Sequence, residues 1–259
     1  MERPSLFALL ALLFTPSCVI VIGDFDRESA RVQRSAEFDT QGASTLRVEC
    51  RNGSITVAQG GPTVEVDATL TVNGPDRAEA NRMADQLELR SHREDDVLRV
   101  FVDVPDDASG WSATMQLRVP AGMALDLDSS NGKIVLQDSF PSVRAETSNG
   151  TIIARCDGEA WLDTSNGRVQ LIGAPQSFWI DTSNAGVTVD LAGDWNGKGE
   201  VRTSNGPIRL NCSGRVRCAT TARTSNGPVT GVRDLRGEPG VGELTLRTSN
   251  ASITVSEAL

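Results

Sequence analysis

The sequence predicts an all-β protein built as a β-solenoid, in which short parallel strands stack in successive coils. Three observations predict it: a corner sequence that recurs along the chain, apolar columns at fixed distances from that corner, and the composition. The 259 residues include 24 glycines, and aromatic residues make up only 4%. This balance suits short strands and tight turns better than helices packed around rings.

The recurrent corner is Thr-Ser-Asn, followed by Gly in most copies, with one Ser-Ser-Asn variant and one early copy within 48–57. From Asn131 onward, neighbouring copies lie 17 to 24 residues apart. The asparagines of all the copies are Asn52, Asn131, Asn149, Asn166, Asn184, Asn205, Asn226 and Asn250. We expect asparagine to tolerate the left-handed conformation at the corner and glycine to supply a positive φ.

Apolar residues keep a fixed distance from each asparagine. Three residues after it stand Ile55, Ile134, Ile152, Val169, Val187, Ile208, Val229 and Ile253. Four residues before it stand Val48, Leu127, Ala145, Leu162, Ile180, Val201, Ala222 and Leu246. The residues between these columns are mostly polar, so each copy predicts two strands of period 2 that meet at the corner.

Two architectures fit such units. Asn-Gly between alternating strands is typical of a type I′ hairpin, which would give an antiparallel meander. A meander gives no reason for identical residues at one corner, whereas stacked coils place each asparagine over the last, about 4.8 Å apart, where the amides can form a ladder. Length varies only in the other connections, as expected of loops on a regular stack, and the repeat therefore favours parallel coils.

The chain divides into a signal peptide at 1–17, a tether and leading strand at 18–41, and a solenoid domain at 42–259. Within the solenoid, 58–123 is an excursion that carries a helix. We expect it to be a small α+β cap on one end of the stack, because the ends of a solenoid expose unpaired strands.

The excursion has its own element signals. Alternating apolar residues predict strands at 63–72, 97–104 and 113–119. Asp76 and Glu79 have the spacing of a capping box, so a helix is expected to begin near Asp76.

The amino terminus has the layout of an export signal: Arg3, an apolar run at 6–14, then Thr-Pro-Ser-Cys. A cysteine directly after a small residue resembles the lipobox of bacterial lipoproteins, which implies lipidation at Cys18. An uncleaved anchor helix over 6–22 and simple cleavage remain the alternatives. The chain is thus expected to be exported and anchored to a membrane of the bacterial cell envelope, in the periplasm or at the cell surface.

Four features together resemble a bacterial family of unknown function whose members are named "putative adhesins". They are the early Asn-Gly-Ser-Ile-Thr-Val coil, the helix-bearing excursion, the strand that ends Arg-Val-Pro-Ala-Gly at 118–122, and the serial Thr-Ser-Asn-Gly units. The resemblance covers about 30–259. It implies a right-handed, single-stranded parallel β-helix at the envelope or cell surface, and no catalytic residues.

Motifs of catalysis are missing from the sequence. It has no nucleophile elbow, P-loop, metalloprotease motif or dinucleotide fingerprint, and its single histidine, His92, stands in a charged stretch typical of a solvated surface. We therefore expect no enzyme activity, no cofactor and no metal site. The net charge of −9 and the lack of a basic stripe exclude nucleic acid as an expected partner.

Four cysteines remain beyond Cys18, an even number in a compartment that permits disulfides. Cys212 and Cys218 are close enough in sequence for a small loop bridge, whereas the pairing of Cys50 and Cys156 is open. Isolated, part-buried thiols are the alternative.

One column carries charge instead of apolar side chains, three residues before each asparagine. It consists of Glu49, Asp128, Glu146, Asp163, Asp181, Arg202, Arg223 and Arg247, which we call the charged stripe. Like charges at strand spacing repel mildly, so we hypothesise that the acidic part recruits divalent cations or a basic partner and the arginines an anionic polymer. A solvated face that prevents edge aggregation is the alternative. On the same outward face, Trp161 and Trp179 would either stack on sugar rings or pack under a loop.

The leading hypothesis is a non-enzymatic adhesin or scaffold, anchored by its lipid, whose partner is an envelope polysaccharide or another surface protein. A carbohydrate-active enzyme of β-helical fold is the main alternative, by fold analogy only. A third hypothesis is self-assembly, with coils added end to end through an uncapped final strand at 252–255.

Overall fold

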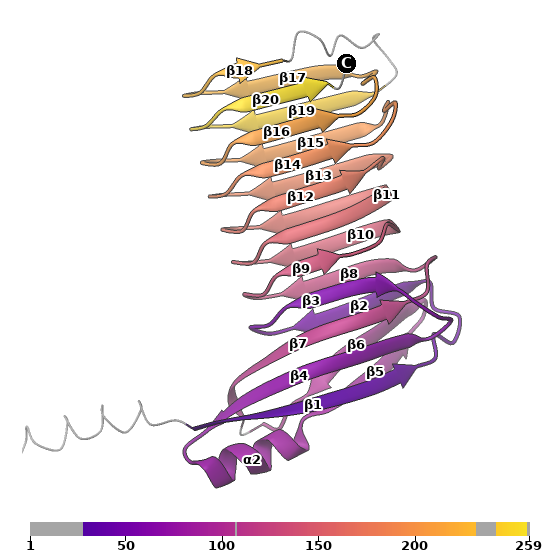
Figure 1. Cartoon of the computed structure of the whole chain (residues 1–259), viewed down its shortest axis with the longest axis vertical. Helices are drawn as coiled ribbons and strands as arrows, with labels where there is room; N and C mark the ends of the chain where they lie inside the picture. Colours follow the sequence, from indigo (N-terminus) through magenta and orange to yellow (C-terminus); the bar gives the residue numbers. More distant parts are fainter. Residues whose placement is uncertain (1–27, 107, 232–241, 258–259) are drawn as a thin grey trace, which may run out of the picture.

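A computed structural model describes residues 28–106, 108–231 and 242–257 of the chain. Strands make up 62% of the protein and helix 5%, so the expected all-β class is confirmed. The described strands form one mixed sheet that wraps almost fully around the core. Figure 1 shows a tall stack of short strands with the single described helix, α2 (Arg77–Gln86), at its lower end.

One half of the sheet, which we call sheet B, has the order β5-β6-β2-β8-β10-β11-β13-β15-β19-β17. Its strands are β5 (Glu88–Glu94), β6 (Val97–Asp103), β2 (Thr45–Cys50), β8 (Ala124–Ser129), β10 (Phe140–Thr147), β11 (Ile152–Thr164), β13 (Ser177–Thr182), β15 (Lys198–Thr203), β19 (Glu243–Thr248) and β17 (Ala219–Thr224). Every pair is parallel except β5 with β6. The antiparallel meander is therefore excluded for the repeats.

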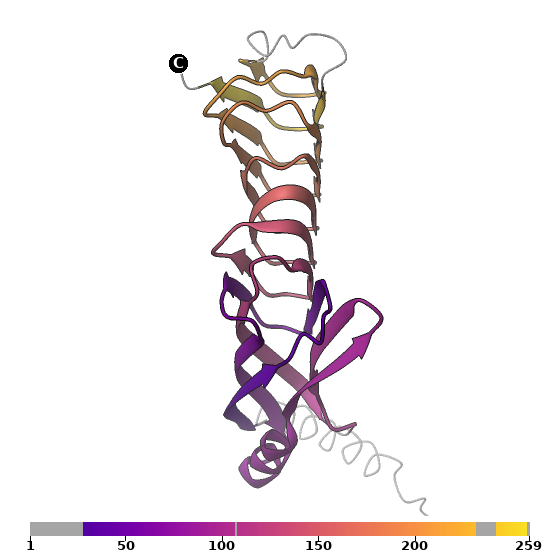
Figure 2. The same ribbon diagram turned by 90° about the vertical axis from the view of Figure 1, so that its right-hand side faces the viewer.

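The other half, sheet A, has the order β1-β4-β7-β3-β9-β11-β12-β14-β16-β20-β18. Its further strands are β1 (Glu28–Phe38), β4 (Val64–Gly74), β7 (Ser109–Val119), β3 (Ile55–Gln59), β9 (Ile134–Leu136), β12 (Val169–Gly173), β14 (Val187–Leu191), β16 (Ile208–Cys212), β20 (Ile253–Glu257) and β18 (Val229–Thr230). The long strand β11 belongs to both sheets and joins them, because its residues 152–155 pair in sheet A and its later residues in sheet B. Figure 2 shows the two sheets facing each other along the stack.

The apolar columns fill the space between the sheets. From the first coil to the coil of β15 and β16, every residue of both columns is at most 1% exposed. In-register pairing stacks each column residue on its counterpart, as when Ile152 pairs with Val169 and Leu162 with Ile180. Burial of this kind contributes about 1.5–3 kcal/mol for each Val, Leu or Ile side chain.

At each corner the asparagine side chains form a ladder. The Asn166 Nδ2 donates to Asn149 Oδ1 at 2.7 Å, and the Asn184 Nδ2 donates to Asn166 Oδ1 at 2.8 Å. Seven such hydrogen bonds, of 2.5–2.9 Å, connect the corner asparagines in the order Asn52, Asn131, Asn149, Asn166, Asn184, Asn205, Asn250 and Asn226. Residues about twenty apart in sequence are thus direct neighbours.

The threonine before each Ser-Asn points inward. Thr164 is 1% exposed, and its hydroxyl donates to the Gly150 carbonyl of the preceding coil at 3.2 Å and accepts from its own Gly167 N–H at 3.2 Å. A buried hydroxyl needs such partners, because burying it unpaired costs about 1–3 kcal/mol. The threonine therefore links two coils inside the corner.

The glycine of the corner has a different role from the expected one. No corner glycine has a positive φ, and among the corner asparagines only Asn52 does, at 55°. A Cβ at Gly150 would lie 1.7 Å from the Gly132 carbonyl oxygen, so glycine is required by close approach between coils. The glycine N–H donates to the side-chain hydroxyl three residues earlier at Gly132, Gly150, Gly167 and Gly206.

The excursion extends both sheets and closes one end of the stack, where β7 pairs with β3 and β6 with β2. The expected helix begins at its N-cap Asp76, whose side chain accepts from the Glu79 N–H at 2.9 Å. The Arg34 guanidinium, on β1, donates to carbonyls at the end of α2: to Asp85 O at 3.1 Å and to O of the C-cap residue Leu87 at 2.9 Å. The strand β5 was not expected, and it contains His92, which is exposed.

The last two coils are stacked in the reverse of their sequence order. The final coil, β19 and β20, lies between the coil of β15 and β16 and the coil of β17 and β18. The coil in the inner place has the larger inward apolar side chains. Leu244 and Leu246 stand there opposite Thr220 and Ala222 of the outermost coil, so this order buries more apolar surface. The expectation of an uncapped final strand at 252–255 is therefore wrong, since β20 pairs with β16 on one side and with β18 at Ile253 and Thr254 on the other.

The expected signal peptide, the apolar run and Cys18 lie outside the described residues. Within the part of the chain that the structure describes, no helix has the length and hydropathy to cross a bilayer.

Candidate functional site

The outer face of sheet B gathers the candidate residues, because the parallel register places equivalent positions on adjacent strands. Asp163 pairs with Glu146 on one side and with Asp181 on the other, and Asp181 pairs with Arg202. The complete charged stripe runs Glu49, Asp128, Glu146, Asp163, Asp181, Arg202, Arg247 and Arg223. It is one continuous row, and only its last two arginines differ from sequence order, as the reversal of the last coils requires.

A second row lies beside the stripe, two residues earlier on each strand and five before each asparagine. It consists of Arg47, Asp126, Arg144, Trp161, Trp179, Glu200, Thr245 and Thr221. We call it the flanking row. Its fixed offset is visible in the sequence, but only its two tryptophans were recognised there.

The flanking row neutralises part of the stripe. The Glu49 carboxylate forms ion pairs with Arg47 at 2.9 Å and with Arg99, on β6, at 2.6 Å. Further along, Arg144 lies 3.2 Å from Glu146, and Glu200 lies 2.7 Å from Arg202. These pairs are exposed, so each contributes only about 0–1 kcal/mol to stability.

Three aspartates of the stripe lack such a partner. Among the described residues, no Lys, Arg or His nitrogen lies within 4 Å of the carboxylates of Asp128, Asp163 or Asp181. Partial burial raises the pKa of all three, and neighbouring carboxylates raise it further, Glu146 acting on both Asp128 and Asp163. Arg202 opposes the rise of the pKa at Asp181.

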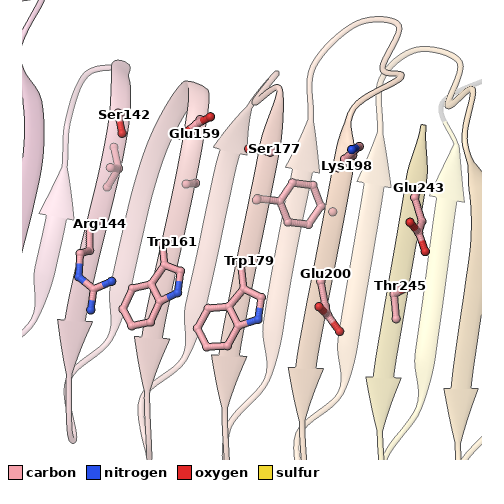
Figure 3. Close-up of a pocket in the computed structure, with 14 residues that line it drawn as sticks. Ser142, Arg144, Glu159, Trp161, Ser177, Trp179, Lys198, Glu200, Glu243 and Thr245 are labelled. Atoms are coloured by element: carbon pink, nitrogen blue, oxygen red, sulfur yellow. The ribbon is translucent and has the colours of Figure 1, made fainter. Parts of the chain in front are cut away.

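The two tryptophans form an aromatic platform with Arg144. The Trp161 and Trp179 rings are stacked, with centroids 4.9 Å apart and an interplanar angle of 12°. The Arg144 guanidinium lies 3.7 Å from the Trp161 centroid, within cation–π range. Figure 3 shows the three side chains in one row across neighbouring strands, followed by Glu200 and Thr245. No loop of the described chain is needed to explain their packing, because the rings pack on each other.

The platform lies in a shallow pocket of about 460 Å³ on the outer face. Its rim adds a third row, which holds Ser142, Glu159, Ser177, Lys198 and Glu243 (Figure 3). Below it, Gly199 leaves room for the buried Phe178, whose ring would lie 2.3 Å from a Cβ there. The pocket thus combines two half-buried indoles with carboxylates, hydroxyls and an ammonium group.

The described cysteines do not form a surface site comparable to the stripe or the platform. Cys50, Cys156, Cys212 and Cys218 are buried thiols, and the bridge expected between Cys212 and Cys218 is not formed in the structure. Both point into the core, where Cys212 is 2% exposed and Cys218 is fully buried. Burial raises the pKa of Cys50 and of Cys156 to about 11, so these thiols stay protonated and unreactive at neutral pH.

Among the described residues, no three His, Cys, Asp or Glu side chains are grouped so that they could hold a metal ion.

No protein-family model and no curated protein sequence matches the chain. Similar solved structures include a "putative adhesin" from Bacteroides fragilis, at 11% identity and a TM-score of 0.47, covering 88% of this chain and 97% of that one. A "putative adhesin" from Parabacteroides distasonis is 12% identical, with a TM-score of 0.41 over 90% of this chain and 98% of that one. A "putative lipid binding protein" from the same species is 11% identical, with a TM-score of 0.38 over 88% and 94%. Similarity at this level assigns neither a family nor a function.

Proposed function

We propose that this chain is a non-enzymatic protein of the bacterial cell envelope, held to a membrane by a lipid on Cys18, which binds a neutral glycan on the outer face of sheet B. Its body is a right-handed parallel β-helix in this proposal. Parallel, in-register pairing of successive repeats supports the β-helix, and the strong preference of parallel crossovers for one hand supports right-handedness.

The observation that carries the binding function is the Trp161–Trp179 platform. Arg144 and Trp179 cover the two faces of the Trp161 ring, so the exposed edges of the half-buried indoles supply the apolar surface for a pyranose. Carboxylates and hydroxyls on the rim accept hydrogens from the sugar hydroxyls. Glu159, Glu200 and Ser177 supply such acceptors in the pocket. The carboxylates on the rim also favour a neutral sugar over an acidic one at this position.

Adhesion or scaffolding follows from the shape of the site. The pocket is open and shallow, and it lies on a flat face that continues over several strands. Such a surface suits a segment of a long polysaccharide more than a small molecule, which binding sites usually enclose.

The test is binding of neutral polysaccharides, purified from bacterial envelopes, to the full chain and to Trp161→Ala/Trp179→Ala. We expect the double variant to lose at least tenfold in affinity, and indole fluorescence of the wild type to change on binding. Trp111→Ala is the matched control, because Trp111 lies on β7 in the cap, and it should bind normally. Equal affinity of the platform variant and the wild type would contradict the proposal.

The same preparations distinguish the enzymatic alternative. A non-enzymatic protein leaves the chain length of every bound polysaccharide unchanged after long incubation. Shortened chains, or new reducing ends that Glu159→Gln or Glu200→Gln abolishes, would replace binding by a carbohydrate-active function.

A further inference from the structure

At the arginine end of the charged stripe, as at its three unpaired aspartates, the flanking row supplies no opposite charge. Where the stripe holds Glu49, Glu146 or Arg202, the flanking row supplies the opposite charge two residues earlier on the same strand. At the next two layers the flanking row holds Thr245 and Thr221 instead. Threonine provides no charge, so Arg247 and Arg223 have no carboxylate oxygen within 4 Å among the described residues.

These two arginines are adjacent. Arg223 pairs in register with Arg247, which pairs with Arg202, so three guanidinium groups stand on neighbouring strands about 4.8 Å apart. Like charges directly opposite each other destabilise a sheet by about 0.2–1 kcal/mol per pair. A bound anion would relieve this repulsion.

The arginines line a concavity of about 830 Å³ at the outermost coils. Ser204, Ser249 and Ser225, one from each corner, line it too and can donate hydroxyl hydrogens. Guanidinium forks bind carboxylate groups with two parallel hydrogen bonds. The concavity therefore offers paired charge and neutral donors on three consecutive layers.

We infer that Arg247 and Arg223, with the serine hydroxyls beside them, bind the carboxylate groups of a linear acidic glycan that runs along the stack. The arginines stand one to a strand, about 4.8 Å apart along the stack, so an extended polyuronate lying along the row can bring carboxylates to more than one of them. Asp181 lines the same concavity and the chain carries a net charge of −9, which disfavours polymers as densely charged as nucleic acid. This site is separate from the tryptophan platform and does not depend on it.

The test compares polygalacturonate with its fully methyl-esterified, uncharged form, using titration calorimetry on the full chain. We expect the charged polymer to bind with an affinity that falls as salt rises, and the ester to bind at least tenfold more weakly. Arg223→Ser/Arg247→Ser should lose at least tenfold in affinity for the charged polymer. Inorganic phosphate is the small-anion arm, and phosphate that competes at micromolar concentration would overturn the assignment to a glycan.

A second variant places carboxylates beside Arg223 and Arg247 without removing either arginine. Thr221→Glu/Thr245→Glu copies the arrangement of Glu200 with Arg202, so it should abolish binding of polygalacturonate while leaving the thermal unfolding temperature unchanged or higher. Undiminished binding by this variant, or no binding by the wild type, would overturn the inference. Trp161→Ala/Trp179→Ala should bind polygalacturonate normally, which separates this site from the platform.

Discussion

Each residue of the repeated corner has a separate physical role. The threonine hydroxyl joins two coils from inside, the asparagine amide joins them from outside, and the glycine lets the backbones approach. The carbonyl that accepts from each threonine belongs to the residue after the corner asparagine of the adjacent coil, which is glycine in four cases and alanine in two, so the roles depend on one another. This dependence explains why the corner recurs while the connecting loops vary.

Thr164→Val tests the inner hydrogen bonds at this scale. Valine has nearly the same shape, but it leaves the Gly150 carbonyl and the Gly167 N–H buried without a partner. The free energy of unfolding should fall by about 1–3 kcal/mol, measured by denaturant titration. Thr164→Ser keeps the hydroxyl and should lose clearly less, and a valine variant as stable as the wild type would contradict the role given to the hydroxyl.

The aspartates of the stripe predict a pH dependence. Burial raises the pKa of Asp163 in the folded state, so the folded protein binds this proton more tightly than the unfolded chain does. Stability contributed by the group is therefore greatest at low pH and is lost as the pH rises through the raised folded pKa.

Asp163→Asn should accordingly raise the thermal unfolding temperature at pH 7, with no gain below the pKa of an unfolded aspartate, about 3.9. Glu49→Gln is the control, because Glu49 is paired with Arg47 and Arg99 and its removal should not stabilise the protein. A higher unfolding temperature for Glu49→Gln than for Asp163→Asn at pH 7 would refute this reading of the stripe.

At the scale of elements, the two outermost coils differ in how much apolar surface they bury. The inward residues of β19 are fully buried, whereas β17 carries Ala222 and two threonines at the matching positions, all partly exposed. The more apolar coil takes the inner place although it comes later in the chain.

Leu246→Ala tests this explanation. It removes a fully buried side chain and should cost about 2–5 kcal/mol of unfolding free energy in chemical denaturation. The matched change in the outermost coil, Ala222→Gly, should cost about 1 kcal/mol or less. A loss of only about 1 kcal/mol for Leu246→Ala would mean that its coil is the exposed, outermost one.

Local patterns predicted most elements but not all. The strands of the repeats, the three strands of the excursion and the helix at Asp76 have alternating or capped sequences, and the structure contains them. The strand β5 has no apolar face, because it is exposed along nearly its whole length, so no alternation indicated it. The reversed order of the last two coils depends on which whole coil buries more apolar surface. No single column of the repeat gives that information.

At the scale of the molecule, the stack converts sequence columns into surface rows. The eight members of the charged stripe were predicted from one fixed offset, and they form one row. The flanking row has an equally fixed offset, but its mixed residue types conceal it until the rows lie side by side. Which stripe charges the flanking row neutralises depends on the directions of the side chains, and these cannot be derived from the sequence.

The central claim is that the coils stack in register, and that the last coil of the sequence lies between the two coils that precede it. Spin labels at the residue before the corner asparagine test it by electron–electron distance measurement, with Cys18 replaced by serine. The pair Arg51→Cys/Ser249→Cys spans six strand spacings, about 29 Å, and Arg51→Cys/Ser225→Cys spans seven, about 34 Å. We expect the second distance to be longer by about one spacing. A longer distance for the first pair, or distances unrelated to the number of layers, would contradict the stack and every row on its surface.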